Sequence, residues 1–258
     1  MNKLPIIIMA LLILMVTGTL VLKKWVLDDS ASSDYTNGYG TMTDSRDGQS
    51  YRTVKIGNQI WMAENLNFEV PNSYCYKNSA DSCTKYGHLY MWSAAMDSAG
   101  TFSPYGIGCG MGKPCTPQYP VQGVCPKKWH LPSAEEWETL LNEVGGKEVT
   151  INNKFAYKSL SGGNILKSTS GWSNDNNGYD LYFFSVLPSG NRKMARKKGK
   201  REPSHRDRGV TNYTDFWSST EANNPTYALF VSFTRSDTIN FIYGSKEFFS
   251  FSIRCVKD

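Results

Sequence analysis

Six cysteines, all of them C-terminal to an apolar segment, constrain this chain more than any other feature. No two are spaced as Cys-x-x-Cys, and the chain has only three histidines. An even number of cysteines without that spacing favours disulfides over a zinc site, and disulfides persist in oxidising compartments. We therefore expect the folded part to lie outside the cytoplasm and to need no metal. The six residues are Cys75, Cys83, Cys109, Cys115, Cys125 and Cys255.

The spacing of the cysteines favours one of the fifteen pairings that six cysteines allow. Cys75 with Cys83, and Cys109 with Cys115, are close enough to form local bridges that close loops containing Asn or Gly. That leaves Cys125 for Cys255. In the chain-entropy model, a bridge that closes a loop of about 130 residues contributes roughly 4 to 5 kcal/mol, more than a short loop. The sequence thus predicts a long-range bridge from the end of the domain to its middle.

The apolar segment runs from Leu4 to Leu22 without a charge, between Lys3 and the pair Lys23 and Lys24. A helix of this length rises roughly 28 Å, about the thickness of a bilayer's hydrocarbon core. It is longer than the apolar region of most signal peptides, so an uncleaved membrane anchor and a cleaved secretory signal both remain open. We expect residues 1–27 to be a signal anchor or signal peptide, with the rest on the periplasmic or extracellular side.

The segment after the apolar helix changes character twice. Residues 28–43 are small and polar without apolar periodicity, which is typical of a flexible tether. From residue 44 the chain gains alternating apolar residues, first at Tyr51–Ile56 between two glycine-containing turns. We therefore predict one domain over residues 44–258, large enough for a single hydrophobic core.

Two helices and several strands are predicted within this domain. Ser133 begins the stronger helix with a capping box to Glu136, and Trp137, Leu140, Leu141 and Val144 follow at helical spacing. A weaker helix is predicted over Leu89–Met96. We expect Trp137, Leu140 and Trp217 in the core. Strands are predicted at Tyr182–Leu187, Tyr227–Phe233, Thr238–Tyr243 and Phe248–Val256, the last three as an antiparallel meander. This order indicates an α+β fold.

A series of short motifs in fixed order resembles a known family. The chain is similar to the Fibrobacter succinogenes major paralogous domain family over nearly all of residues 44–258. The motifs are Asp44–Gln49, Tyr51, Val54–Gly57, Gln59–Asn67, Cys75–Tyr76, Tyr86–Gly87, Trp92 with Ala94–Asp97, Cys125–Pro126, Trp129–Pro132, Phe216–Glu221 and Arg254–Lys257.

That family resembles in turn the C-type lectin-like fold and its relative in sulfatase-modifying enzymes. Leu131–Ser133 before a helix with Trp137, and Arg254–Val256 at the end, carry this second likeness. It implies an α+β, C-type lectin-like fold of two helices with small antiparallel sheets, stapled by disulfides and preceded by an N-terminal membrane helix.

The stretch from Arg192 to Arg208 departs from the family and concentrates the positive charge. Its net charge is +7, whereas the whole chain carries +5, so the remainder is about −2. Without apolar periodicity or strand alternation, we expect a mobile loop there. It has no interleaved aromatic residues, so we do not expect nucleic-acid binding. Clustered cations attract polysaccharide, anionic envelope polymers or acidic lipid, with a solvated insertion as the alternative. The candidate ligand-binding residues are Lys197, Lys198, Lys200 and Arg201.

A second candidate set lies in an Asn- and Gly-rich segment. Trp172, Asn174, Asp175 and Asp180 offer an aromatic ring and oxygen ligands for a sugar or for Ca²⁺. The segment lacks the EF-hand register, and an ordinary turn is the alternative reading. We therefore predict no cofactor, with calcium as a weakly supported exception.

We expect a non-catalytic binding module at the cell envelope, with carbohydrate as the first ligand class. The second hypothesis is a structural envelope protein that makes only scaffolding contacts. A sulfatase-modifying-type oxidase is third, because all six cysteines are assigned to bridges and leave no thiol pair for catalysis. The chain also lacks the Gly-x-Ser-x-Gly elbow of serine hydrolases, so we do not expect an enzyme.

Overall fold

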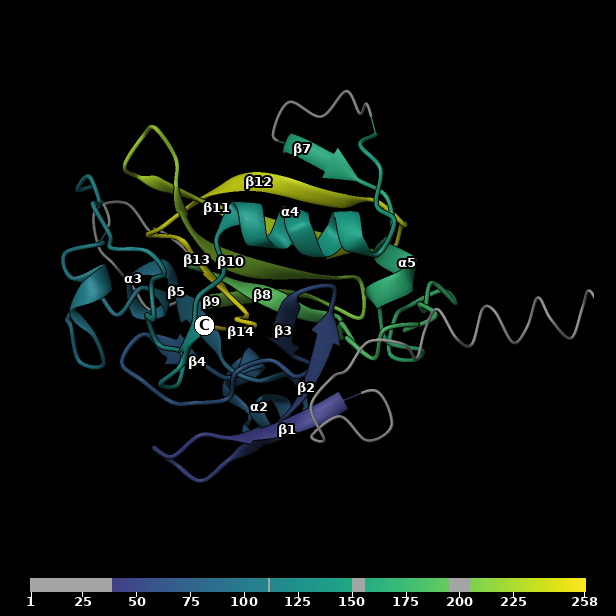
Figure 1. Ribbon diagram of the computed structural model, residues 1–258, viewed down its shortest axis with the longest axis horizontal. Coiled ribbons are helices and arrows are strands. Elements are labelled where there is room, and N and C mark those ends of the chain that lie inside the picture. Colours follow the sequence, from purple (N-terminus) through teal and green to yellow (C-terminus); the bar gives the residue numbers. More distant parts are fainter. Residues whose placement is uncertain (1–38, 111, 150–155, 195–204) are drawn as a thin grey trace, which may run out of the picture. The chain divides into compact units, whose positions relative to one another are not determined.

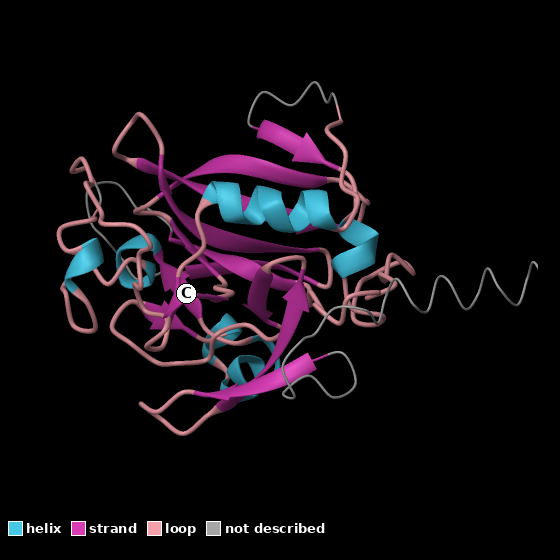
Figure 2. Ribbon diagram, viewed as in Figure 1, coloured by secondary structure: helices cyan, strands magenta, loops and turns pink. Residues whose placement is uncertain are grey.

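Two β-sheets make up most of the protein (Figures 1 and 2). The computed structural model describes residues 39–110, 112–149, 156–194 and 205–258. Within these ranges it contains fourteen strands, five in one sheet and nine in the other. The helices are few and short by comparison, as the small share of cyan in Figure 2 shows.

The five-stranded sheet is antiparallel and takes in both ends of the described chain. Its strands β2 and β3 form a hairpin whose turn is made by Gly57, with φ of +56°, and Asn58. The strand nearest the C-terminus lies between two strands that come much earlier in the sequence. In spatial order the strands are β1 (Tyr39–Thr43), β2 (Ser50–Ile56), β3 (Gln59–Met62), β14 (Val256–Lys257) and β6 (Trp129–His130).

The nine-stranded sheet is antiparallel except where β8 pairs with β10 in parallel. Strands β10, β11 and β12 form a meander, and β9 pairs only with β8. In spatial order the strands are β4 (Ser73–Tyr74), β5 (Leu89–Met91), β13 (Phe249–Phe251), β8 (Ser189–Met194), β10 (Tyr213–Glu221), β11 (Tyr227–Thr234), β12 (Ile239–Ser245) and β7 (Ala156–Leu160), with β9 (His205–Val210) alongside β8.

Helix α4 (Ala134–Glu143) lies across the meander (Figure 1) and follows the prediction closely. The Ser133 hydroxyl accepts from the Glu136 N–H at 3.2 Å, and the Ser133 N–H donates to the Glu136 carboxylate at 2.8 Å. The same carboxylate bonds His130, whose other ring nitrogen lies 2.7 Å from Asp258. The predicted capping box is confirmed, and Glu136 also connects the helix to β6.

The prediction of an α+β, C-type lectin-like fold with two helices and small antiparallel sheets is wrong. Fourteen strands dominate the described residues, and the helices besides α4 span at most seven residues: α2 (Ala80–Tyr86), α3 (Trp92–Ala95) and α5 (Gly163–Leu166). The predicted helix at Leu89–Met96 is strand β5 followed by one turn of helix. Leu89 and Tyr90 are both buried, because this segment pairs with β4 and β13.

Two predicted strands also differ from the structure. Tyr182–Leu187 forms only a single bridge, from Val186 to Lys167, because Phe183 and Ser185 have φ values of +57° and +54°, which extended strands do not allow. Phe248–Val256 divides into β13 and β14, which belong to different sheets. It is therefore not the third strand of the meander.

The segments around the domain also need revision. Strand β1 takes up the last five residues of the predicted tether. The two ends of the stretch predicted as a mobile basic loop lie in β8 and β9, which pair as an antiparallel hairpin, while residues 195–204 lie outside the described residues. None of the helices in the described residues is long and apolar enough to span a bilayer. The predicted anchor, Leu4–Leu22, lies outside the described residues.

The core consists of two aromatic clusters. Under α4, the ring centroid of Trp137 lies 4.7 Å from that of Trp61 and 5.3 Å from that of Phe216. In the second cluster, Trp217 packs 4.3 Å from Phe251 and donates its indole N–H to the Tyr90 carbonyl. Trp137, Leu140 and Trp217 are fully buried, as predicted.

Truncation of Trp137 to Ala should lower the free energy of unfolding by about 3 to 5 kcal/mol, the usual cost of removing a large buried aromatic side chain. Denaturant titration with an unchanged m-value would measure it. Tyr179→Ala is the matched control, since that ring is 67% exposed, and it should change the free energy by less than about 0.5 kcal/mol. Equal effects of the two substitutions would contradict the assignment of Trp137 to the core.

Candidate functional site

All six cysteines form disulfides in the structure. The bridges are Cys75–Cys83, Cys109–Cys115 and Cys125–Cys255, the pairs that the spacing predicts. Cys125 and Cys255 are both fully buried, so the long-range bridge is part of the core. Three disulfides indicate an oxidising, extracytoplasmic environment.

The predicted sugar or calcium residues separate into different environments. Trp172 is buried, and its indole N–H donates to the Val186 carbonyl at 3.1 Å. The Asp180 carboxylate accepts from the backbone N–H and the hydroxyl of Ser185. Asn174 and Asp175 are exposed in a turn with positive φ. The structure therefore does not assemble these four residues into one cage of oxygen ligands.

The predicted basic cluster lies partly outside the described residues, which include none of Lys197, Lys198, Lys200 and Arg201. Of its described members, Arg192 points inward and is fully buried. Its guanidinium pairs with Asp207 at 2.7 Å and donates to the Cys75 carbonyl at 3.0 Å and to the Asn78 side chain at 2.8 Å. Arg192 thus stabilises the β8–β9 hairpin and a neighbouring loop, and it is not a free surface cation.

The outward face of the hairpin carries the remaining described cations. Lys193 lies directly opposite Arg206 in the register, and Arg208 follows on the same face two residues later. All three side chains are exposed. Like charges placed directly opposite one another destabilise a sheet. This arrangement therefore has a folding cost that an anionic partner would offset.

A broad, open hollow lies beside the turn that connects β9 to β10, next to Arg208. We call it the β9–β10 hollow. Its lining comes from three turns that are distant in sequence and contains amides, hydroxyls, one phenol and two exposed guanidiniums. The lining residues are Asn176, Arg208, Gly209, Asn212, Tyr213, Thr234, Arg235 and Ser236.

Hydrogen bonds join two turns of the hollow, and the pairing of Tyr213 with Thr234 places the third turn beside them. The Ser173 N–H donates to the Thr211 carbonyl at 2.7 Å, and the Ser173 hydroxyl donates to the Asn212 side-chain oxygen at 2.9 Å. In the third turn, the hydroxyls of Thr234 and Ser236 lie 2.9 Å apart. The segment predicted as a ligand-binding turn thus contributes to the hollow through Ser173 and Asn176.

A buried lysine lies beneath this third turn. The Lys167 ammonium donates to the carbonyls of Thr234, Arg235 and Ser236 at 3.1 to 3.3 Å and lies 4.8 Å from the centroid of the Trp172 ring. Burial lowers the pKa of Lys167, although nearby Asp237 opposes the change. Two exposed guanidiniums therefore line the hollow, and the Lys167 ammonium lies beneath one of its turns.

Tyr213 packs against the backbone at the floor of the hollow. Gly209 has φ of +84°, and a Cβ at that position would come within 2.1 Å of the Tyr213 ring, so only glycine allows this approach. Burial, with a smaller contribution from Asp215, raises the pKa of Tyr213 to about 12. The phenol therefore keeps its proton at neutral pH and can donate it to a ligand.

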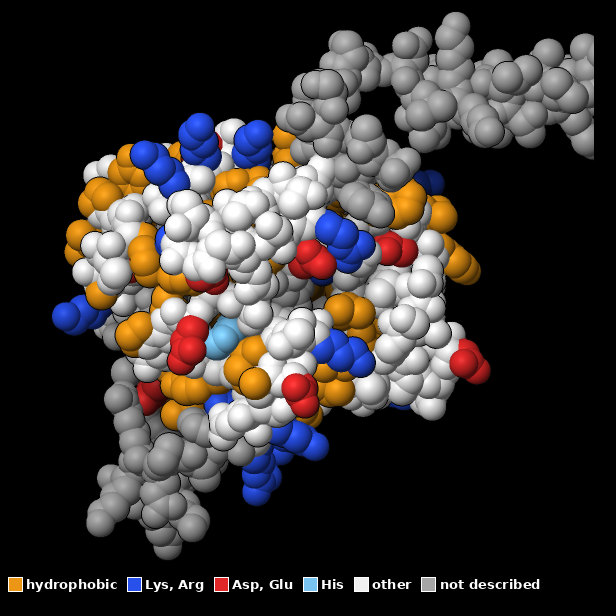
Figure 3. All heavy atoms as spheres, turned by 90° about the horizontal axis from the view of Figure 1, so that it is seen from below, with side chains coloured by type: hydrophobic (Ala, Val, Ile, Leu, Met, Phe, Trp, Pro, Cys, Tyr) orange, Lys and Arg blue, Asp and Glu red, His pale blue; other side chains and the backbone are white. Residues whose placement is uncertain are grey.

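One face of the molecule is mixed in charge. On the face seen in Figure 3, which is viewed from below Figure 1, acidic and basic side chains lie interspersed among apolar ones. Such mixing is typical of a solvated surface.

One family model matches this chain. The model of the Fibrobacter succinogenes major domain covers residues 54–257. The chain belongs to this family. Comparison with curated proteins and with solved structures gave no match. The matched range includes the β8–β9 hairpin, the hollow and all three disulfides, so these features lie inside the family domain.

The sequence reasoning missed most of the hollow. The sequence predicts Arg235 and Ser236 only as part of a turn between two strands, and it contains no motif that marks Asn212 or Tyr213 as ligand-binding residues. The available signal was the recurrence of polar turns containing Arg, Asn and Ser after apolar strands, but spacing alone does not show that three such turns meet.

Asp215, two residues after Tyr213 on the same face of β10, should make stability depend on pH. Burial raises its pKa from 3.8 to about 6, although hydrogen bonds from Ser232 and Asn191 oppose the rise. A raised carboxyl pKa favours the protonated native state, so its contribution is fully present below about pH 4 and is lost as pH rises through about 6. Relative to Asp215→Asn, the parent should lose about 3 kcal/mol between pH 4 and pH 7. Denaturant titrations across this range that gave parallel profiles would contradict it.

Proposed function

We propose that this protein is a non-catalytic, extracytoplasmic binding module whose β9–β10 hollow holds an acidic polysaccharide. The observation that carries the proposal is that the exposed guanidiniums of Arg208 and Arg235 line one open hollow together with amides and hydroxyls. Because the lectin-like fold is excluded, the carbohydrate hypothesis now depends on the chemistry of this hollow and not on analogy between folds.

The lining groups can bind both the anionic substituent and the hydroxyl groups of an acidic sugar. Guanidiniums form paired hydrogen bonds with carboxylate or sulfate groups, so Arg208 and Arg235 suit the anionic substituent. The side chains of Asn212, Thr234 and Ser236 can exchange hydrogen bonds with sugar hydroxyls. The hollow is open along the surface, which suits a segment of a polymer better than an enclosed small substrate.

The cationic face of the hairpin extends the binding surface. Arg206 lies two residues from Arg208 along β9, roughly 7 Å farther from the hollow, and Lys193 lies opposite Arg206 on β8. A polymer with regularly spaced anionic groups could contact this face and the hollow together. Lys197, Lys198, Lys200 and Arg201, between the two strands in sequence, would add to the attraction.

A binding role without catalysis agrees with the state of the reactive side chains. All six cysteines are in bridges, and both ring nitrogens of His130 are bonded to carboxylates.

We propose further that Leu4–Leu22 anchors the protein to a membrane and leaves the disulfide-bonded domain on the outer side. A purely structural envelope role is the outcome if no polymer binds.

Binding to polygalacturonate by the full-length, disulfide-intact protein tests the proposal. We expect affinity to fall steeply between about 50 and 500 mM salt, because counterions are released on binding. Arg208→Ser with Arg235→Ser should weaken it at least tenfold without changing the melting temperature, because both side chains are exposed.

The matched control removes two exposed cations elsewhere, Lys55 and Lys85, and should leave the affinity unchanged. Neutral dextran should bind weakly to all of these proteins. If the parent shows no binding to polygalacturonate at low salt, or if the Arg208 and Arg235 variant binds as well as the parent, the hollow is not a polysaccharide site.

A further inference from the structure

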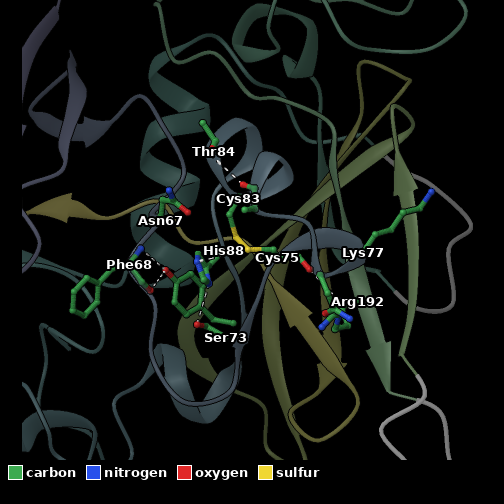
Figure 4. Close-up of a disulfide and its surroundings, with 12 residues drawn as sticks. Asn67, Phe68, Ser73, Cys75, Lys77, Cys83, Thr84, His88 and Arg192 are labelled. Carbon is green, nitrogen blue, oxygen red and sulfur yellow. Dashed lines mark hydrogen bonds between the residues drawn. A yellow bond between two sulfur atoms is a disulfide. The ribbon is translucent and has the colours of Figure 1, made fainter.

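A histidine lies against the Cys75–Cys83 disulfide, as Figure 4 shows. The two sulfur atoms and a ring nitrogen of His88 all lie within 4.8 Å of one another. The distance from His88 Nε2 to Cys75 Sγ is 4.0 Å. His88 and Cys83 are buried, while Cys75 is half-buried.

The hydrogen bonds of Ser73 determine which nitrogen of His88 carries the proton. The Ser73 hydroxyl donates its single hydrogen to the Val70 carbonyl at 2.8 Å and accepts from the Val70 N–H at 3.0 Å. With that hydrogen on the Val70 carbonyl, the 3.1 Å contact with His88 Nδ1 is a bond that Nδ1–H donates. In this tautomer the unprotonated nitrogen is Nε2, and its lone pair is the one available beside the sulfurs.

We propose that reduction of Cys75–Cys83 converts this cluster into a binding site for a soft divalent cation such as Zn²⁺. The two electrons come from a dithiol, which becomes a disulfide, or from a phosphine, which becomes its oxide by taking an oxygen atom from water. The S–S bond breaks, and each sulfur takes up one proton from the dithiol or from that water. On binding, the cation displaces both protons and takes Cys75 Sγ, Cys83 Sγ and His88 Nε2 as ligands. The fourth position is left for water or an external ligand. The intact disulfide, with no thiolate, should not bind.

The geometry needs little change to reach a tetrahedral site. With zinc–sulfur and zinc–nitrogen bonds of about 2.3 and 2.1 Å, neighbouring ligand atoms lie about 3.6 to 3.8 Å apart. The His88 to Cys75 distance of 4.0 Å is already close to that value. The two cysteine Cα atoms are 4.9 Å apart, so the freed sulfurs can separate by rotation about their side-chain bonds. The Nδ1–H to Ser73 bond is the supporting contact that a metal-binding histidine usually makes.

The backbone around the cluster is held by contacts other than the disulfide. Arg192 donates to the Cys75 carbonyl at 3.0 Å, and the His88 N–H donates to the Leu66 carbonyl at 3.1 Å. The Cys83 carbonyl accepts from the Gly87 N–H at 2.8 Å in the last turn of α2. These bonds should keep the three ligand residues in place after reduction. Cys83 also lines a surface cleft.

Cobalt binding to the full-length chain tests this inference independently of polysaccharide binding. A background variant with Cys109→Ser and Cys115→Ser removes the other bridge that has a half-buried sulfur. After reduction by a phosphine, confirmed by peptide mapping of Cys75 and Cys83, we expect one equivalent of Co²⁺ with thiolate charge-transfer absorption, displaced by Zn²⁺. The oxidised protein should show none.

Three substitutions decide between a site and an adventitious pair of thiols. His88→Gln should weaken Co²⁺ binding at least tenfold, and Ser73→Ala should weaken it by about tenfold because the histidine loses its orienting partner. His130→Gln is the matched control and should have no effect. Circular dichroism of each variant checks that it is folded. Reduced protein without thiolate absorption, or a folded His88→Gln variant that binds as tightly, would overturn the proposal.

Discussion

The buried guanidinium of Arg254 is the interaction on which much of this structure depends. It donates to the Asn65 side chain at 2.7 Å and to the carbonyls of Met62, Phe184 and Ser185 at 2.5 to 3.3 Å. Burial lowers its pKa to about 9, so it stays charged at neutral pH. A buried cation is tolerated only when its donors are satisfied. The carbonyls at the end of β3 and in the loop after α5 must therefore stay where they accept hydrogen bonds from the guanidinium.

Arg254 lies in the short segment that belongs to both sheets. Strand β13 before it pairs with β5 and β8, while β14 after it lies between β3 and β6. Cys255 adds the bridge to Cys125, and its carbonyl accepts from the Met62 N–H at 3.0 Å. The same segment thus holds β8, which carries the cationic hairpin and the Arg192 contact to the Cys75 loop. Both proposed sites are built on elements that this segment fixes in place.

Local signals in the sequence were sufficient for some of this architecture. The capping box of Ser133 and Glu136 predicted the start of α4. Such a motif can be recognised in the sequence because its two residues lie within one helical turn. The fold class was missed because the short strands depend on partners far away in sequence, as β13 and β14 do. In the basic stretch, the buried positions of β8 and β9 also hold charged residues, because Arg192 pairs with Asp207 inside the protein. The sequence therefore shows no alternation of apolar and polar residues that would indicate a strand. The β9–β10 hollow is formed by three distant turns, and its Tyr213 resembles any other tyrosine in a strand until those turns meet.

Hydrogen–deuterium exchange in an Arg254→Met variant tests this dependence most directly. Methionine keeps much of the volume but removes every donated hydrogen bond, so the acceptors around it lose their partner. The account predicts faster amide exchange in both sheets, at β3 and β14 as well as at β8 and β13, together with the loop around Phe184. Faster exchange confined to the residues that contact Arg254, with both sheets protected as in the parent, would contradict it.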